Sequence, residues 1–162
     1  MVIVEYDPAW PATFTRLRDE VCAALGDLAL AVKHVGSTAV PGLPAKPIVD
    51  LDAVIPAPAD LPAAVARLAA RGYAHEGDLG IAGREAFRPP TDLPRHHLYV
   101  VAAGAAELRR HLLFRDHLRA HPDAARAYAD LKRAAASRGD DRAAYTRAKD
   151  EFVAAILRQA GE

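Results

Sequence analysis

The sequence predicts an α+β domain, in which a mixed β-sheet flanked by helices is followed by a helical C-terminal subdomain. Three observations point to this fold class. Short apolar runs typical of strands alternate with amphipathic helical patterns over residues 1–104. Helical periodicity alone fills residues 105–162. The length of 162 residues suits one domain, so we expect a single domain with a mixed part, 1–104, and a helical part, 105–162.

Strands and helices are expected to alternate in the mixed part. A short strand at Val2–Val4 comes before a helix that Asp7-Pro8 can open and Gly26 can end, because proline suits the first helical turn and glycine follows the last. The next elements are expected in this order: a strand at Leu28–Val35, a loop at Gly36–Pro47, a strand at Ile48–Ile55, a helix at Asp60–Gly72, a strand that begins in Tyr73–His75, and a hairpin of Ala82–Arg88 with Arg95–Val101.

Three helices are expected in the helical part. Pro122 disfavours helical backbone at the residue before it, so a break falls at His121. The helices around and after this break are expected to span Ala105–Ala120, Pro122–Ser137 and Asp140–Ala160.

The composition excludes several classes of protein. The 21 Lys and Arg residues balance the 21 Asp and Glu residues, so no overall field attracts nucleic acids or membranes. Cys22 is the single cysteine, which excludes an internal disulfide, and its apolar helical surroundings indicate a core residue. No apolar run approaches the ~20 residues of a membrane span, and no secretory segment opens the chain. We expect a cytoplasmic protein with no nucleic-acid or membrane partner, and the composition leaves its oligomeric state open.

The most informative stretch is the Gly36-Ser37 turn, which is followed by a strand that carries Asp50 and Asp52. Side chains alternate across a strand, so both carboxylates face the same side. Their mutual repulsion favours a bound cation, and Mg²⁺ and Mn²⁺ prefer oxygen ligands. The backbone N–H groups and the hydroxyl of a Gly-Ser turn suit a phosphate. Together these residues predict a site for a metal–nucleotide complex.

The order of Gly-Ser and Asp-x-Asp resembles the start of the active site in the nucleotidyltransferase superfamily, whose fold is polymerase-beta-like. The stretch from His34 to Asp50 closely resembles the signature of the GrpB family. Further stretches extend this resemblance over nearly the whole chain: Tyr6–Pro11, Gly83-Arg84, His97–Val100, Phe114–Arg119, and Tyr145 with Lys149. The same family is found as an extra C-terminal domain in some actinobacterial dephospho-CoA kinases. The resemblance implies a nucleotidyltransferase fold with a helical C-terminal part, and it locates the site more firmly than it defines a reaction.

The sequence departs from the superfamily at the third carboxylate. Catalytic nucleotidyltransferases usually carry one on a neighbouring strand, but the expected neighbour, Arg95–Val100, offers histidines and no acid. His96 and His97 face opposite sides of that strand, and the resemblance favours His97 as the one beside the aspartates. This histidine is either a hydrogen-bonded structural residue, or a metal ligand or general base that replaces the acid. Glu85 on the preceding strand could supply the acid, although nothing in the spacing favours it.

Four basic residues are candidates for binding phosphate. Lys46 follows the Gly-Ser loop, and it either neutralises a phosphate, pairs with an aspartate or is simply solvated. Arg84 shares one strand face with Arg88, where both either grip phosphate oxygens or are ordinary edge-strand residues. Arg115 and Lys149 each lie on an apolar helix stripe, where an unpaired cation is costly. Each of them therefore extends to water, forms a structural ion pair or projects into a cleft that holds anions.

The leading hypothesis is a metal-dependent nucleotidyltransferase that binds an NTP, with ATP favoured. Asp50 and Asp52 would hold Mg²⁺ or Mn²⁺, Gly36 and Ser37 would contact the phosphates, and His97 would orient or deprotonate a small-molecule acceptor. The charge that develops on the phosphates would be neutralised by Lys46, Arg84, Arg115 and Lys149. Two alternatives stay open: a non-catalytic ligand-binding or scaffold module of the same fold, and an ATP-dependent ligase-type enzyme that uses the same cleft.

Overall fold

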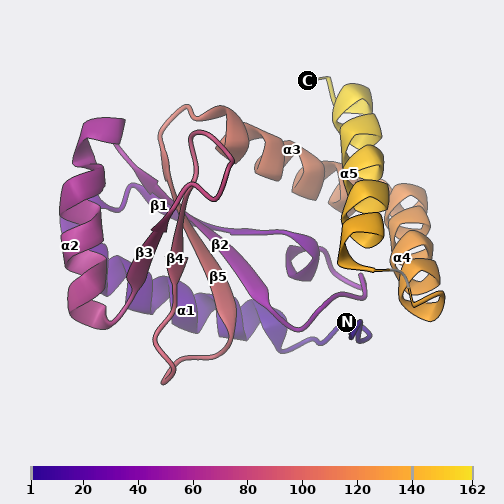
Figure 1. Cartoon of the computed structure of the whole chain (residues 1–162), viewed down its shortest axis with the longest axis horizontal. Coiled ribbons are helices and arrows are strands. Elements are labelled where there is room, and N and C mark those ends of the chain that lie inside the picture. Colours follow the sequence, from indigo (N-terminus) through magenta and orange to yellow (C-terminus); the bar gives the residue numbers. More distant parts are fainter. Residues whose placement is uncertain (1, 140, 162) are drawn as a thin grey trace.

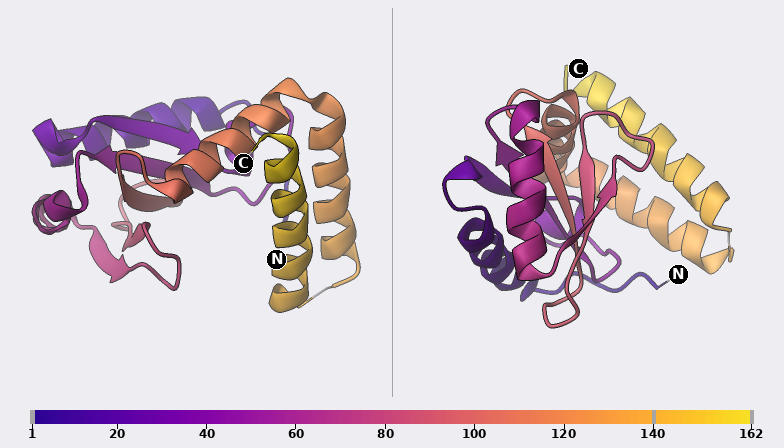
Figure 2. Two further views of the ribbon diagram at one scale, coloured as in Figure 1. Left: turned by 90° about the horizontal axis from the view of Figure 1, so that it is seen from above. Right: turned by 60° about the vertical axis from the view of Figure 1, so that its left-hand side comes forward.

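Five strands form one mixed sheet whose two faces are covered by different helices (Figure 1, Figure 2). The computed structural model describes residues 2–139 and 141–161. Helices α1 (Trp10–Leu25) and α2 (Leu61–Arg71) pack on one face of the sheet, and α3 (Ala106–Ala120) crosses the other face. Beyond one end of the sheet, α4 (Pro122–Ser137) and α5 (Arg142–Gln159) lie side by side. This arrangement confirms the predicted α+β class.

The sheet has the strand order β1-β2-β5-β4-β3. Its two central strands, β2 (Val49–Ile55) and β5 (His96–Ala102), run parallel. The remaining strands, β1 (Ala31–Val35), β4 (Glu85–Arg88) and β3 (Ala74–Gly77), each run antiparallel to the neighbours that they pair with. The predicted hairpin between the last two strands in the chain is therefore confirmed, and the expected neighbour of the aspartate strand is correct.

The pairing of β2 with its neighbours determines which side chains meet. Asp50 is paired with His97 across the parallel pair, and Asp52 is paired with Lys33 on β1 and Tyr99 on β5. Because cross-strand partners share a face of the sheet, these side chains project together. They lie on the face opposite to α1, where α3 crosses.

Alternation along β2 separates this polar face from a buried apolar face. Leu51 is fully buried and packs with Leu98 in the same cluster as Leu17 and Val21 of α1. Full burial of one such side chain contributes roughly 1.5–3 kcal/mol. A slip of one residue would turn this apolar set to the polar face, so the burial of Leu51 fixes the position of both aspartates.

A second apolar cluster joins the loop after β1 to the helical part. Leu43 of this loop belongs to a cluster with Leu118 of α3 and Tyr128 of α4. The ring of Phe152 on α5 stacks on Tyr128 with 5.0 Å between the ring centroids. The loop is thereby held against the helices, and Lys132 of α4 bonds Ser37 of the Gly-Ser turn.

The N-terminal strand is the main difference from the predicted elements. Val2–Val4 forms only an isolated bridge between Val4 and Ala45. The next pair along such a ladder would join Val2 to Pro47, and proline has no N–H to donate to a ladder. The strand expected from Leu28 begins at residue 31, because residues 26–28 form a 3₁₀ turn.

The other predicted elements are confirmed to within a few residues. The loop 36–47 contains a short 3₁₀ turn, Ser37–Ala39. The expected helix start at Asp140 lies outside the described residues, and Asp141 caps α5 by accepting a hydrogen bond from Ala144 N at 2.7 Å. Cys22 is partly buried and packs against the core, as expected. None of the helices in residues 2–139 and 141–161 is long and apolar enough to cross a membrane.

Candidate functional site

The Gly36-Ser37 turn lies directly against Asp50. Gly36 has a φ of 74°, a backbone conformation that residues with a Cβ rarely adopt. A Cβ at this position would lie 2.3 Å from Asp50 Oδ2, a distance at which the two atoms overlap. Glycine is therefore required both by the backbone angle and by the approach of the carboxylate.

His97 lies beside Asp50 on the solvent-exposed side of the site. Its Nδ1 lies 2.7 Å from Asp50 Oδ1, and 52% of the His97 side chain is exposed. With Nδ1–H donated to the carboxylate, Nε2 is the ring nitrogen that can accept a proton. His96 points to the opposite face, where its ring bonds the Tyr73 hydroxyl at 2.7 Å and Pro94 O at 2.6 Å. The structure thus places His97, and not His96, beside the aspartates.

Asp52 is covered by a histidine of α3. His111 Nδ1 lies 2.6 Å from Asp52 Oδ2, and Asp52 is 0% exposed. The other ring nitrogen of His111 lies 3.4 Å from Glu107 Oε2. Burial raises the pKa of Asp52, and the Asp52 carboxylate raises the pKa of His111 against the effect of burial. The pair therefore holds a proton firmly between its two members.

Lys132 of α4 reaches the Gly-Ser turn from the helical part. Its Nζ donates to Ser37 Oγ at 2.6 Å and to Pro44 O at 3.1 Å. The amine also lies 4.7 Å from the centre of the Tyr128 ring, and only 3% of Lys132 is exposed. Ser37 is therefore held by a buried cation at the position where the sequence predicts contact with a phosphate.

Lys132 at this turn and Lys46 of the same loop are both repelled by Lys149 of α5. Burial, and then the charge of Lys149, lowers the pKa of Lys132 to about 7, while Asp50 acts in the opposite direction. Burial, and then the charge of Lys149, also lowers the pKa of Lys46, which lies over the Tyr145 ring. The repulsion on Lys46 is increased by two further cations: Arg142 and Arg95. An anion bound among these groups would relieve their repulsion.

The other sequence-predicted residues fall into different places. Arg84 lies on the aspartate face, 4.2 Å from the centre of the Tyr99 ring, and its buried Nε has no hydrogen-bond partner within the described residues. Arg115 points instead to the outer edge of β1, where it donates to His34 O at 3.1 Å. Glu85 bonds His75 at 3.0 Å, so it does not supply a third carboxylate to the aspartates.

Sequence reasoning missed three residues of the site: His111, Tyr128 and Lys132. A signal for Lys132 was available, since it follows Tyr128 by four residues on the buried side of α4, the same feature that identified Lys149. No local pattern identifies His111. Its contact with Asp52 depends on how α3 crosses the sheet.

The two aspartates offer oxygen atoms to a divalent cation. Asp52 Oδ1 is buried and has no hydrogen-bond partner in the part of the chain that the structure describes, and the Asp50 side chain is partly exposed. Mg²⁺ is often bound through one or two carboxylates together with substrate phosphates, so this donor set fits it. No group of three or more His, Cys, Asp or Glu side chains in residues 2–139 and 141–161 is arranged to hold a metal ion. The remaining ligands would have to come from a substrate.

Sequence comparison connects the chain to bacterial relatives. A family model described as GrpB protein matches residues 1–159. A UPF0157 protein of Pseudomonas aeruginosa is 45% identical over 98% of this chain and 66% of its own length. The UPF0157 protein YqkA of Bacillus subtilis is 35% identical over 93% of this chain and 44% of its own length. A dephospho-CoA kinase of Mycolicibacterium paratuberculosis is 30% identical over 98% of this chain and 45% of its own length. The chain therefore spans between 44% and 66% of the length of these relatives.

Comparison with solved structures agrees with the fold. The GrpB protein of Enterococcus faecalis matches 98% of this chain and 96% of its own, with a TM-score of 0.86 and 32% identity. The structure of Cid1 in complex with its short product ApU matches 82% of this chain and 42% of its own, with a TM-score of 0.57 and 12% identity. At this identity the second likeness shows a nucleotidyltransferase-like fold and no more.

Proposed function

We propose that this chain, which belongs to the GrpB family, binds an NTP with a divalent cation and transfers a nucleotidyl group to a small-molecule acceptor. The nucleotidyltransferase-like fold and the two aspartates on one face of β2 support the proposal. A structure of the Cid1 poly(U) polymerase, at a TM-score of 0.53 and 12% identity, has MgGTP bound. A fold of this kind can therefore hold a metal–nucleotide complex.

The observation that carries the proposal is the crowding of cations around Ser37. The charge of Lys149 lowers the pKa of both Lys46 and Lys132 beyond the effect of burial, and Asp50 is the carboxylate that opposes this on both. A triphosphate brings several negative charges and would turn the repulsion into attraction. The site is thus better suited to a polyanion than to a neutral ligand.

Each group has a role that follows from its position. Ser37 and Lys132 would bind phosphate oxygens, and Asp50 and Asp52 would hold Mg²⁺ or Mn²⁺. The ion would neutralise charge on the phosphates. His97 Nε2 would accept the proton of the acceptor hydroxyl while the acceptor oxygen bonds to the α-phosphorus and the bond to pyrophosphate breaks.

Calorimetric titration with ATP and Mg²⁺ tests the proposal. Lys149→Met keeps the apolar stem and removes the charge, so the free energy of unfolding should change by less than ~1.5 kcal/mol. The affinity for ATP should fall at least tenfold, a loss of ~1.4 kcal/mol. Arg147→Met is the matched control, because Arg147 is exposed on the same helix, and its affinity for ATP should be unchanged. Equal ATP affinity in the two variants would refute the proposed nucleotide site. No binding of any common NTP at millimolar concentration would refute it as well.

One observation favours a second candidate, a non-catalytic ligand-binding module of the same fold. Asp52 is wholly buried and bonded to His111, and β5 offers no third carboxylate. Such a module would bind nucleotide and release no pyrophosphate. Pyrophosphate release in the presence of a panel of small hydroxyl compounds distinguishes the two, since release that depends on one acceptor establishes transfer. Tight nucleotide binding without release across the panel would favour the module.

A further inference from the structure

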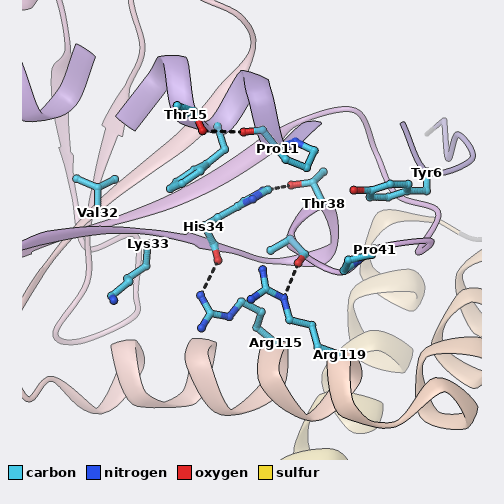
Figure 3. Close-up of a pocket in the computed structure, with 12 residues that line it drawn as sticks. Tyr6, Pro11, Thr15, Val32, Lys33, His34, Thr38, Pro41, Arg115 and Arg119 are labelled. Atoms are coloured by element: carbon cyan, nitrogen blue, oxygen red, sulfur yellow. Dashed lines mark hydrogen bonds between the residues drawn. The ribbon is translucent and has the colours of Figure 1, made fainter. Parts of the chain in front are cut away.

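A cavity separate from the aspartates lies at the outer edge of β1, between α1 and α3 (Figure 3). We call it the edge cavity, and its walls include Tyr6, Phe14, His34, Thr38, Arg115 and Arg119. Its volume of about 360 Å³ lies within the range of ~300–1,000 Å³ that is usual for small-molecule pockets. The edge cavity and the candidate site meet at one turn. Ser37 bonds Lys132 of the candidate site, and the next residue, Thr38, bonds His34 Nε2 at 2.8 Å inside the edge cavity.

Two arginines of α3 reach the edge cavity from one side (Figure 3). Arg115 Nη1 donates to His34 O at 3.1 Å, and Arg119 Nε donates to Ala39 O at 2.8 Å. Each guanidinium carries five N–H donors in a planar fork, so both side chains are fixed in position by the backbone and still have donors for a ligand. Burial, and then the charge of Arg115, lowers the pKa of Arg119.

The charge of this wall is not balanced within the cavity. Lys33 adds a third cation, and no Asp or Glu of the described residues lines the edge cavity. Asp116 bonds Arg115 Nε at 2.8 Å, but its side chain is 60% exposed, and solvent weakens such a pair. A ligand that completes the site should be an anion, and arginine binds carboxylate or phosphate oxygens through paired N–H groups.

The opposite wall is aromatic and apolar. Phe14 stacks on the ring of His34 with 4.7 Å between the centroids and 5° between the planes. Burial lowers the pKa of His34 to about 4, so this ring is neutral near pH 7 and adds no charge. Tyr6 and Val32 extend the wall. Such surroundings suit a flat apolar group, which aromatic side chains contact through their faces and edges.

We propose that the edge cavity binds a small anion with a planar apolar body, either a phosphate monoester or a carboxylate. Arg115 and Arg119 hold the anionic group, and the wall of Phe14 and Tyr6 contacts the body. This binding needs neither the aspartates nor a nucleotide, so it stands independently of the proposed transfer reaction.

Three probes test the edge cavity: phenyl phosphate, benzoate and inorganic phosphate. Trp10 is the single tryptophan, and its ring centroid lies 5.3 Å from that of Tyr6, so its fluorescence reports on occupancy. Phenyl phosphate or benzoate should change this fluorescence in a saturable way. Inorganic phosphate should bind at least tenfold more weakly than the better aromatic probe, because it lacks the apolar body. The order of the two aromatic probes tells which anionic group the cavity prefers.

Variants of two arginines on α3 locate the binding. Arg119→Gln should weaken the better aromatic probe at least tenfold, and Arg119→Lys, which keeps the charge, should weaken it less. Arg109→Gln is the matched control, because Arg109 is exposed on the same helix and does not line the cavity, and it should bind as wild type does. Lys149→Met should also bind the probe as wild type does, whatever it does to ATP.

Histidine NMR signals give an independent location. Titration with the probe should move the ring signals of His34 and leave those of His97 in place. Three results would overturn the proposal: equal probe affinity in Arg119→Gln and Arg109→Gln, loss of probe binding in Lys149→Met, or no saturable signal with either aromatic probe.

Discussion

Removing the buried amine of Lys132 should change how the stability of the protein depends on pH. A lysine in an unfolded chain has a pKa of ~10.4, whereas burial and the charge of Lys149 lower the pKa of Lys132 to about 7 in the folded protein. Between these two values the unfolded chain binds a proton that the folded protein does not, so the free energy of unfolding rises with pH. The slope approaches ~1.4 kcal/mol per pH unit, which gives about 2 kcal/mol between pH 7.5 and 9.0.

Urea unfolding at several pH values measures this effect. Lys132→Met keeps the apolar stem and cannot titrate, so wild type should gain about 2 kcal/mol relative to the variant between pH 7.5 and 9.0. At a typical denaturant slope of ~2 kcal/mol per M, the difference between the two urea midpoints should change by about 1 M over this pH range. Below pH 6 the difference should be constant, because the lysine is then charged in both states. Lys33→Met, at an exposed position on β1, should keep the pH dependence of wild type.

Ligand binding gives a second measurement on the same amine. A bound phosphate favours the charged form of Lys132 and raises its pKa. Binding of ATP at pH 8 should therefore take up a proton, which titrations in buffers of different ionisation enthalpy can count. The uptake should disappear in Lys132→Met. If wild type and Lys132→Met show the same pH dependence of stability, then Lys132 does not titrate near pH 7 and the reasoning about the crowded lysines fails.

Three further predictions concern the carboxylates and the turn. Asp50→Asn and Asp52→Asn should each weaken Mg²⁺-dependent ATP binding in calorimetry. Asp50→Asn should keep or raise the stability without metal, because a like-charge repulsion is relieved, whereas Asp52→Asn removes the partner of His111 and should lower it; unfolding of the Asp50→Asn apoprotein would make that carboxylate structural. Gly36→Ala combines a strained φ with a 2.3 Å overlap, so its melting temperature should fall further than that of Gly42→Ala, where φ is 81° and no atom lies within 4 Å. Equal losses would mean that the contact with Asp50 is not tight. His111→Leu should cost ~3–5 kcal/mol in urea unfolding, because it leaves a buried carboxylate without its partner. Adding Asp52→Asn should recover part of this loss, and strictly additive losses would show that the two residues are not coupled.

Local patterns were sufficient to predict most of the fold. Leu17, Val21 and Leu25 recur at helical spacing and are all fully buried in α1. Pro122 ends one helix and starts the next, because its ring restricts the residue before it and its missing N–H is not needed in a first turn. The strand at Val2–Val4 could not be excluded in the same way. Its failure depends on Pro47, which lies far along the chain and meets it only in the folded state.

Part of the candidate site was predicted from the sequence. The part that was not predicted depends on tertiary contacts between distant elements. Strand alternation is local, so the common face of Asp50 and Asp52 and the separation of His97 from its neighbour followed from the sequence. An apolar stripe shows that a cation lies near a core, but it does not show which neighbour the cation meets. Arg115 and Lys149 gave the same signal, yet the first lies on the edge of β1 and the second near Lys132. The difference lies in the elements that each helix packs against in the fold, since Arg115 is on α3 and Lys149 on α5, and no pattern within either helix encodes them.

A structural role accounts for Asp52 and His111, but it does not account for the lysines near Ser37. Asp52 and His111 compensate each other: the carboxylate is buried, and the histidine supplies its hydrogen bond. Such a pair needs no ligand. Within residues 2–139 and 141–161, the lysines near Ser37 have no comparable compensation, because Asp50, the carboxylate that opposes the repulsion on Lys46 and Lys132, already bonds His97. Holding three amines together costs free energy that a bound polyanion would recover. The lysines, more than the aspartates, therefore support a ligand, and Asp52 Oδ1, which has no hydrogen-bond partner among the described residues, is where a cation brought by that ligand would be held.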